Sequence, residues 1–111
     1  NRIKVYQKTD DKFIRKMGPI ILNTRTQLVS SYGQQTKLTP RLVRILEILI
    51  KHHGKVVERD WLFKKVWETE YTGDTRTLDV HISWLRQAIE EDHHNPKLIK
   101  TERGVGYQLD L

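Results

Sequence analysis

The stretch that decides the fold is TRTLDVHISWLRQAIEE, residues 75–91. Its large apolar residues recur at Leu78, Ile82, Leu85 and Ile89, a spacing that places them on one narrow arc of an α-helix. Because a continuous apolar arc must be kept from water, this side of the helix is expected to face a core. The function must then be sought on the opposite side.

That opposite side carries hydrogen-bonding groups beside two large apolar side chains. Its residues are Arg76, Val80, Ser83, Trp84 and Gln87. Such a face suits the major groove of DNA, because polar groups match base edges and apolar atoms match thymine methyl groups. The alternative is that Val80 and Trp84 pack against the preceding loop or against the C-terminal hairpin. On the flanks lie Thr77 and His81 on one side and Asp79 and Arg86 on the other.

The ends of this helix are also marked in the sequence. Asp74 and Thr75 are both good N-caps, and Asn95-Pro96 is expected to end the helical pattern. Arg76 stands in the first turn, where the helix dipole disfavours a cation. A nearby DNA phosphate would reverse that cost, and so would pairing with Asp74 or Asp79.

Short apolar pieces alternate with turn residues between Met17 and Leu38. Residues 19–22, 27–29 and 36–38 are predicted strands, and residues 23–25 and 31–34 are the predicted turns between them. The spacing suits an antiparallel meander.

A first helix is expected after Thr39-Pro40, because Thr is a good N-cap and Pro suits the first helical position. Gly54 gives it a C-terminal stop. Its core-facing residues are Leu42, Ile45, Leu46 and Leu49.

The pair Val56-Val57 leads into a second helix, whose start is weakly marked by Glu58 or by Asp60. The acidic, glycine-containing loop 68–74 follows it. The apolar face of this second helix is formed by Leu62, Phe63, Val66 and Trp67.

The C-terminus reads as a β-hairpin. Residues 98–101 and 107–109 are predicted strands, and Gly104 and Gly106 are expected to supply the positive φ angles of the turn between them. Arg103 stands at the tip, where it could reach a narrow minor groove or remain a solvated turn residue.

Composition bounds the class of protein. The chain has 111 residues, 37% of them hydrophobic, which suits one domain with a modest core. There is no cysteine, so disulfides and thiolate chemistry are excluded. No apolar run could cross a membrane and no signal peptide is evident, which together fit a cytoplasmic domain. The first residue is Asn rather than Met, which indicates a fragment of a longer protein.

The net charge of +6 favours a polyanionic partner only mildly, because the charge is unevenly distributed. Residues 1–16 carry six basic and two acidic side chains and are expected to form a linker or lead-in, although Ile3, Val5 and Tyr6 could form a short strand. The domain itself is expected at residues 17–111. Residues 57–74 carry three basic and five acidic side chains.

Two motifs together resemble a known family. Residues 75–86 (TRTLDVHISWLR) and 99–107 (IKTERGVGY) are similar to the signature of the OmpR/PhoB-type effector domains of bacterial response regulators. Residues 38–40 and 54–57 match two further sequence motifs of the same family. The resemblance covers residues 17–111.

The resemblance implies an α+β fold, a winged helix-turn-helix with an N-terminal antiparallel four-stranded sheet, three helices and a C-terminal hairpin wing. The third helix, about 75–91, would read the major groove, and the wing, about 101–107, would contact the adjacent minor groove. The loop 68–74, with Glu68, Glu70, Tyr71 and Asp74, would contact RNA polymerase. No cofactor is implied.

The resemblance also assigns roles to single residues. Arg76, Thr77 and His81 match positions that touch phosphate or the groove wall. Val80 and Trp84 match base-facing positions. Some relatives carry basic residues in place of Ser83 and Trp84. The bases that those relatives read are therefore not assigned to Ser83 and Trp84 of this chain. The remaining positions are Arg86, which reads a base or braces Asp79, Arg103 of the wing, and Thr101 and Tyr107, which contact the backbone or support the wing.

Relatives carry an N-terminal receiver domain phosphorylated by a sensor kinase, and they bind direct repeats as tandem pairs. The isolated domain is expected to be a monomer.

The sequence also bears on three other functions. The pairs His52-His53 and His93-His94 lack the spacing of a metal site, and no phosphate-cradling loop or catalytic arrangement stands out, so an enzyme is not expected. A helix cannot read the deep, narrow major groove of A-form RNA. A winged helix used as a protein-interaction module stays open, because the acidic segment 57–74 and an exposed Trp84 would both allow it.

Overall fold

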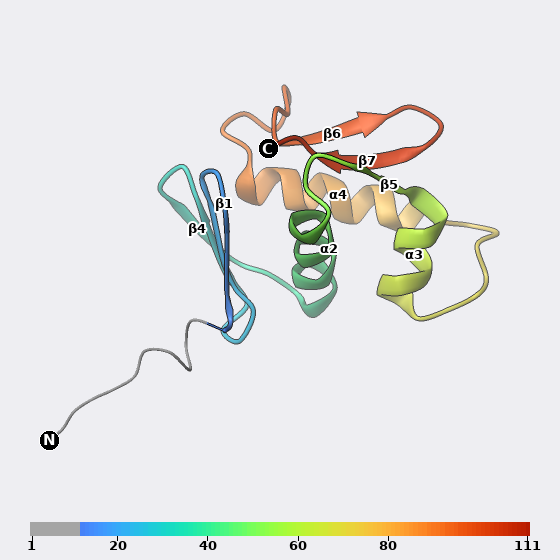
Figure 1. The fold of residues 1–111 in the computed structure, drawn as a ribbon, viewed down its shortest axis with the longest axis horizontal. Coiled ribbons are helices and arrows are strands. Elements are labelled where there is room, and N and C mark those ends of the chain that lie inside the picture. The colour runs from blue at the N-terminus through green and yellow to red at the C-terminus, as the bar shows by residue number, and fades with distance from the viewer. Residues whose placement is uncertain (1–11) are drawn as a thin grey trace, which may run out of the picture.

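The structure is a computed structural model, and it describes residues 12–111. The expected strand at Ile3, Val5 and Tyr6 lies outside the described residues. The elements in chain order are β1 (Ile14–Met17), β2 (Ile20–Asn23), β3 (Leu28–Ser31), β4 (Gln34–Lys37), α2 (Pro40–Lys51), β5 (Val56–Glu58), α3 (Arg59–Trp67), α4 (Arg76–Ile89), β6 (Ile99–Glu102) and β7 (Gly106–Leu109). The predicted α+β winged-helix fold is confirmed (Figure 1).

The N-terminal sheet has the strand order β1-β2-β3-β4, with every neighbour antiparallel. Tyr32 and Gly33 form the two-residue turn between β3 and β4, with φ angles of 51° and 79°. Two left-handed residues in succession match the twist of the flanking strands, as in a type I′ turn. The apolar side of the sheet buries Ile20, Leu22 and Val29.

Two expectations for this sheet are corrected. Residues 14–16 of the expected linker lie in β1, because Ile14 to Met17 pair in register with β2, so the sheet begins before residue 17. The sequence predicts Gln27 in a strand, but its φ of 63° places it in the turn before β3.

Helix α2 forms as the sequence predicts. The Thr39 hydroxyl accepts a hydrogen bond from the Leu42 N–H, with Pro40 at the first helical position. The helix ends at Lys51, before the left-handed Gly54 at φ 79°. Its buried residues include the four expected ones.

A second sheet, with order β5-β7-β6, joins the C-terminal hairpin to the helices. The sequence did not reveal β5, which is only three residues long, although Val57 is buried in it. Gly106 has no positive φ, so the turn uses Gly104 alone, at φ 77°. A side chain at Gly106 would place its Cβ 1.9 Å from the Val57 carbonyl oxygen, so this glycine permits close strand packing.

Helix α4 ends at Ile89, earlier than the predicted residue 91 and well before Asn95-Pro96. The reason is Glu90, which adopts an extended conformation and is only 9% exposed. Its carboxylate accepts hydrogen bonds from the backbone N–H groups of Lys97, Leu98 and Ile99 at 2.7–3.0 Å. These bonds anchor the chain as it enters β6.

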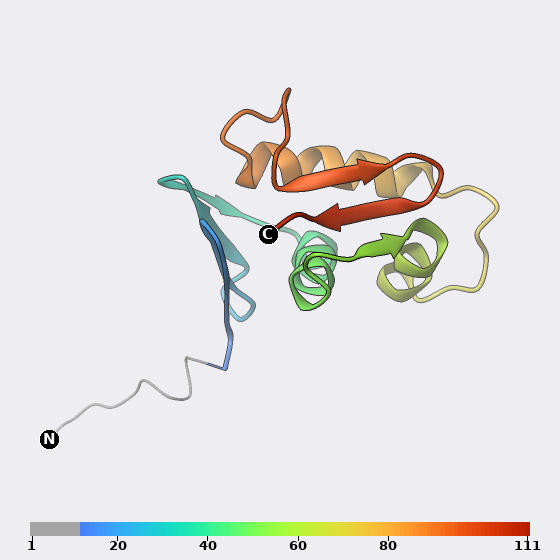
Figure 2. The same ribbon diagram turned by 45° about the horizontal axis from the view of Figure 1, so that its top comes forward.

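The core lies between the helices and the two sheets. The predicted stripe of α4 is buried, with Leu78, Ile82, Leu85 and Ile89 at most 1% exposed. The hairpin β6–β7 lies along α4, while the N-terminal sheet stands beyond its C-terminal end (Figures 1 and 2). None of the helices in residues 12–111 is long and apolar enough to cross a membrane.

Candidate nucleic-acid interface

The outward face of α4 remains uncovered. Val80 is 45% exposed and Trp84 is 49% exposed, and Thr77, Ser83 and Gln87 are exposed beside them. Packing of Val80 and Trp84 against the loop or hairpin, the alternative open from the sequence, is therefore not what the structure shows. The helix presents two apolar side chains among polar ones, as a base-reading surface requires.

His81 links this face to α3. Its Nδ1 lies 2.8 Å from the Thr77 carbonyl oxygen, and because a carbonyl only accepts, this nitrogen carries the proton. The imidazole ring stands 5.0 Å from the ring centroid of Trp67 and 5.0 Å from that of Trp84. Trp67 in turn stacks on Phe63 at 4.6 Å.

Arg76 is paired with Asp74. Its Nε and Nη2 donate to the Asp74 carboxylate at 2.9 and 2.8 Å, and its backbone N–H donates to the same group at 3.2 Å. The guanidinium of Arg76 lowers the pKa of Asp74 to about 2. The carboxylate thus offsets the unfavourable interaction of Arg76 with the helix dipole. Arg76, expected to contact DNA, and Asp74, expected to contact RNA polymerase, are therefore bound to each other.

Arg86 fastens α4 to the wing. It donates to the Ile99 carbonyl oxygen at 2.8 Å and to the Thr101 hydroxyl at 2.8 Å, and its guanidinium stands 5.8 Å from the Tyr107 ring centroid. Of the two roles expected for Arg86, bracing Asp79 is not what the structure shows, because its guanidinium donates to β6. The position of Arg86 instead fixes how the hairpin lies on the helix.

Asp79 is held by two residues that the sequence did not connect with it. Arg59 of α3 donates to its carboxylate, with Nη1 at 2.6 Å, and the Tyr107 hydroxyl of β7 donates as well. The hydrogen bonds from Arg59 lower the pKa of Asp79, and the same pairing raises the pKa of Arg59. Burial is the main cause that raises the pKa of Tyr107. Asp79 therefore ties α4 to α3 and to the wing.

Arg59 also makes hydrogen bonds at the N-terminal ends of α3 and α4. Its Nε donates to the Thr75 hydroxyl at 2.9 Å, and Thr75, the N-cap residue of α4, makes no side-chain capping bond. Glu58 likewise does not cap α3 with its side chain. Instead the N–H of Arg59 donates to the Val105 carbonyl oxygen of the wing at 2.9 Å. No periodic signal marks Arg59 in the sequence, because its partners are distant along the chain.

The wing tip is open to solvent. Arg103, Gly104 and Val105 are exposed, and Thr101 is exposed on β6. Tyr107 is only 6% exposed and its hydroxyl is bound to Asp79, which favours the wing-supporting one of its two expected roles.

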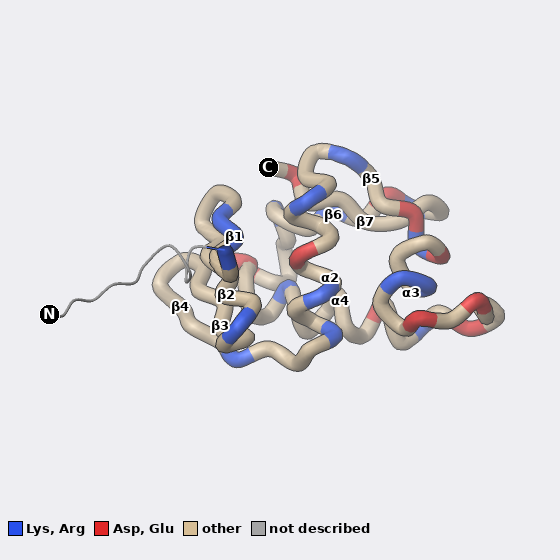
Figure 3. Tube along the Cα trace, turned by 60° about the horizontal axis from the view of Figure 1, so that its bottom comes forward, with Lys and Arg blue, Asp and Glu red and all other residues tan. Residues whose placement is uncertain are grey.

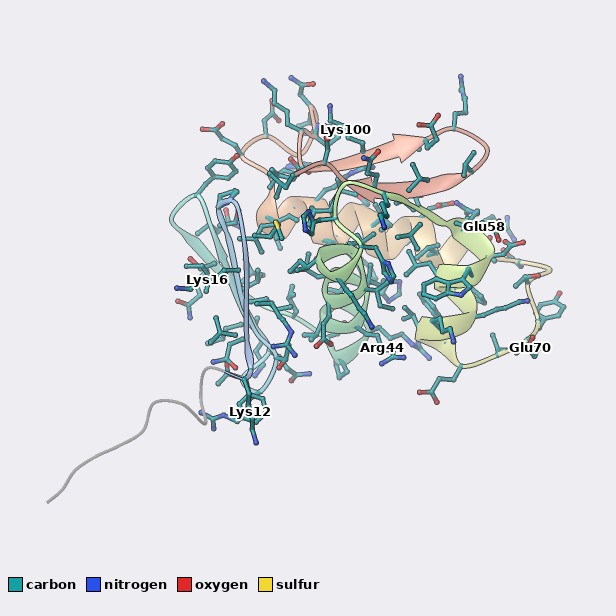
Figure 4. All side chains as sticks on the ribbon, viewed as in Figure 1. Lys12, Lys16, Arg44, Glu58, Glu70 and Lys100 are labelled. Atoms are coloured by element: carbon teal, nitrogen blue, oxygen red, sulfur yellow. The ribbon has the colours of Figure 1, made fainter. Side chains whose placement is uncertain are left out.

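The loop 68–74 projects between α3 and α4, and it gathers acidic residues, whereas α2 and α3 carry basic ones (Figure 3). Glu68 ends α3 in a left-handed conformation, with φ 53°. Glu70 lies in the loop beyond the end of α3, and its carboxylate is 3.6 Å from the Lys64 ammonium (Figure 4). Tyr71 is 69% exposed.

This arrangement of helices, outward-facing third helix and hairpin defines a winged helix-turn-helix domain. A family model described as "Transcriptional regulatory protein, C terminal" matches residues 33–109. The chain belongs to this family, the OmpR/PhoB-type effector domains, whose members are DNA-binding transcription regulators and not a class of enzymes.

Individual relatives agree with this assignment. The chain is 39% identical over 100 residues to the sensory transduction protein RegX3 of Mycolicibacterium smegmatis, covering 90% of this chain and 44% of RegX3. It therefore spans less than half the length of this curated relative.

Two solved structures share the fold. The response regulator DrrB, an OmpR/PhoB homologue from Thermotoga maritima, has a TM-score of 0.75 at 32% identity, covering 88% of this chain and 44% of DrrB. The Klebsiella pneumoniae RstA DNA-binding domain, solved in complex with the RstA box, has a TM-score of 0.75 at 29% identity, covering 87% of this chain and 96% of that domain.

Proposed function

We propose that this chain binds double-stranded DNA in a sequence-specific manner, with α4 in the major groove and the wing at the adjacent minor groove. The observation that carries the proposal is the exposed face of α4, where Val80 and Trp84 stay about half exposed while the opposite stripe is buried. Leaving two large apolar side chains in water is unfavourable unless a partner covers them.

Within this proposal the residues divide by what they touch. Val80, Ser83 and Trp84 lie on the base-reading face and set sequence preference, whereas Thr77, His81 and Arg76 set the position on the backbone. Arg76 must exchange the Asp74 carboxylate for a phosphate to do so. Because the guanidinium of Arg86 is bound to β6, we assign it to positioning the wing and not to reading a base.

The wing contributes one arginine to the contact. Arg103 is exposed at the hairpin tip, and the network of Asp79, Arg59 and Tyr107 fixes the base of the hairpin against α4. A basic tip held at a fixed position can reach the minor groove beside the major groove that α4 occupies.

The loop 68–74 is proposed as the contact with RNA polymerase. Its support is the exposure of Tyr71 and of the acidic side chains Glu68, Glu70 and Asp74, which this loop gathers beyond the end of α3 (Figure 3). A Tyr71→Ala variant should bind DNA as the wild type does but lose transcription activation in a reconstituted polymerase assay. Equal activation by both proteins would remove the loop from the proposal.

In the whole protein we expect a receiver domain that a sensor kinase phosphorylates, and a cytoplasmic location. The chain alone should be a monomer that occupies direct-repeat sites as a tandem pair.

The test is selection of binding sites from a random duplex library, followed by fluorescence anisotropy of the selected duplex across a salt series. Two direct half-sites about one helical turn apart, bound with a steep salt dependence, would support the proposal. Absence of any enriched sequence would refute sequence-specific binding and would favour a protein-interaction role for the exposed α4 face.

A further inference from the structure

The rings of Trp67, His81 and Trp84 form a continuous aromatic strip that crosses from α3 to the outward face of α4. Adjacent ring centroids are 5.0 Å apart at both contacts. One end of this strip, Trp84, lies on the base-reading face. The other end, Trp67, is covered by a residue from a third helix, Arg41 of α2.

Arg41 is a cation without a charged partner. Its guanidinium carbon stands 4.9 Å from the Trp67 ring centroid, and within residues 12–111 its side chain makes no hydrogen bond or ion pair. It lies in the first turn of α2, which contains no acidic residue, so the helix dipole opposes its charge. Arg76 occupies the same kind of place at the start of α4, but there Asp74 neutralises it.

We propose that Arg41 binds a backbone phosphate of the duplex that α4 enters, so that the interface extends from α4 across Trp67 to the start of α2. This inference rests on the proposed function. A phosphate supplies the anion that Arg41 lacks and turns the dipole at the start of α2 from unfavourable to favourable.

The stack on Trp67 prepares Arg41 for this contact. A guanidinium held over an indole ring has lost part of its rotational freedom before binding, so less entropy is lost when its N–H donors engage a phosphate. Arg41 is exposed, so its N–H donors stay available to an anion. The contact is independent of base sequence, because only the sugar-phosphate backbone is touched.

The experiment compares Arg41→Ala with the wild type on the selected duplex and on a scrambled duplex, by anisotropy across a salt series. We expect roughly a tenfold rise in Kd at low salt on both duplexes. The slope of log Kd against log salt should fall by about one unit, the value for one phosphate contact. Arg41→Lys should retain most of the salt slope, because it keeps the charge.

Arg25→Ala is the matched control. Arg25 is also an exposed arginine stacked on an aromatic ring, 5.7 Å from the centroid of Phe13, but it lies in the turn between β2 and β3. Its removal changes the net charge equally and should leave the salt slope nearly unchanged. Thermal unfolding of each variant checks that Trp67 stays packed, and Arg41→Gln, which retains most of the side-chain volume, should bind as Arg41→Ala does.

Three results would overturn the inference. Equal losses for Arg41→Ala and Arg25→Ala would show a general charge effect and no contact. Wild-type affinity and slope for Arg41→Ala, with sequence-specific binding by the wild type, would reject the Arg41 contact and leave the proposed function standing. Failure of the wild type to select any duplex would reject the proposed function itself.

Discussion

Replacing Asp79 by Asn tests whether one carboxylate joins the three parts of the candidate interface. Asp79 lies on α4 and accepts hydrogen bonds from Arg59 of α3 and from the Tyr107 hydroxyl of β7. Asn has nearly the same shape but no charge, so the substitution keeps the packing and removes the ionic part of the network. The helix, the preceding helix and the wing should then be held together less firmly.

The size of the effect follows from the exposure of the partners. A hydrogen bond to a charged group contributes about 1.5–3 kcal/mol when it is well shielded. Here the side chain of Asp79 is 44% exposed and that of Arg59 is 33% exposed, so water screens the pair and the low end applies. We expect Asp79→Asn to lower the free energy of unfolding by about 1–2 kcal/mol at pH 7, and each kcal/mol to lower Tm by roughly 4–8 °C.

The effect should depend on pH with a definite sign. Hydrogen bonds from Arg59 lower the pKa of Asp79 below its ordinary value of 3.8. A carboxylate with a lowered pKa stabilises the fold fully above its unfolded pKa, and this stabilisation is lost as the pH falls through the folded pKa. The difference between wild type and Asp79→Asn should therefore be full at pH 7 and smaller at pH 3.

Urea unfolding at both pH values measures this difference. Asp110→Asn is the control, because Asp110 is an exposed partner of Lys100 at 4.0 Å and should contribute at most about 1 kcal/mol. The reasoning would be refuted if Asp79→Asn were as stable as the wild type at pH 7, or if it lost the same amount at pH 7 and pH 3.

Further substitutions test other parts of the molecule. Leu85→Ala should cost about 2–5 kcal/mol in urea unfolding, because Leu85 is fully buried, and a loss near zero would mean that the core face of α4 is misassigned. Gly106→Ala should cost about 1–3 kcal/mol, since its Cβ would meet a backbone carbonyl of β5 at 1.9 Å. Gly104→Ala, with free space around it but a φ of 77°, should cost less, and the reverse order would contradict the assignment. Trp84→Ala should change the preference among selected duplexes with little change in Tm, whereas a large fall in Tm with unchanged preference would make Trp84 a core residue. Arg103→Ala should reduce the salt slope of binding by about one unit, and an unchanged slope would remove the wing from the interface.

Most of the fold could be predicted from the sequence where the signal is local. The apolar stripe of α4, the Thr39-Pro40 start of α2 and the glycine turn of the hairpin each depend on neighbours within a few residues. Such patterns are set by helical periodicity, capping and φ preferences, which a sequence records directly. The sequence did not predict the short strand β5, because three residues show no periodicity and the strand depends on pairing with β7.

The sequence predicted the exposed face of α4 but not the hydrogen bonds that connect α4 to α3 and to the wing. The exposure of Val80 and Trp84 follows from their place opposite the core stripe. The sequence pattern does not predict the partners of Asp79 and Arg86, because the residues that bind them come from α3 and from the hairpin. Arg41 likewise gained a place beside the interface only through its contact with Trp67.

The sequence by itself therefore determined the periodic elements, the faces they bury and the family to which the chain belongs. The tertiary structure alone decided which polar side chains are committed inside the domain and which remain available to a partner. The physical reason is that periodicity and capping are properties of adjacent residues, whereas an ion pair or a ring stack requires two distant segments to meet. Arg86, bound to β6, and Arg41, without a charged partner among residues 12–111, show that difference between two arginines that the sequence could not separate.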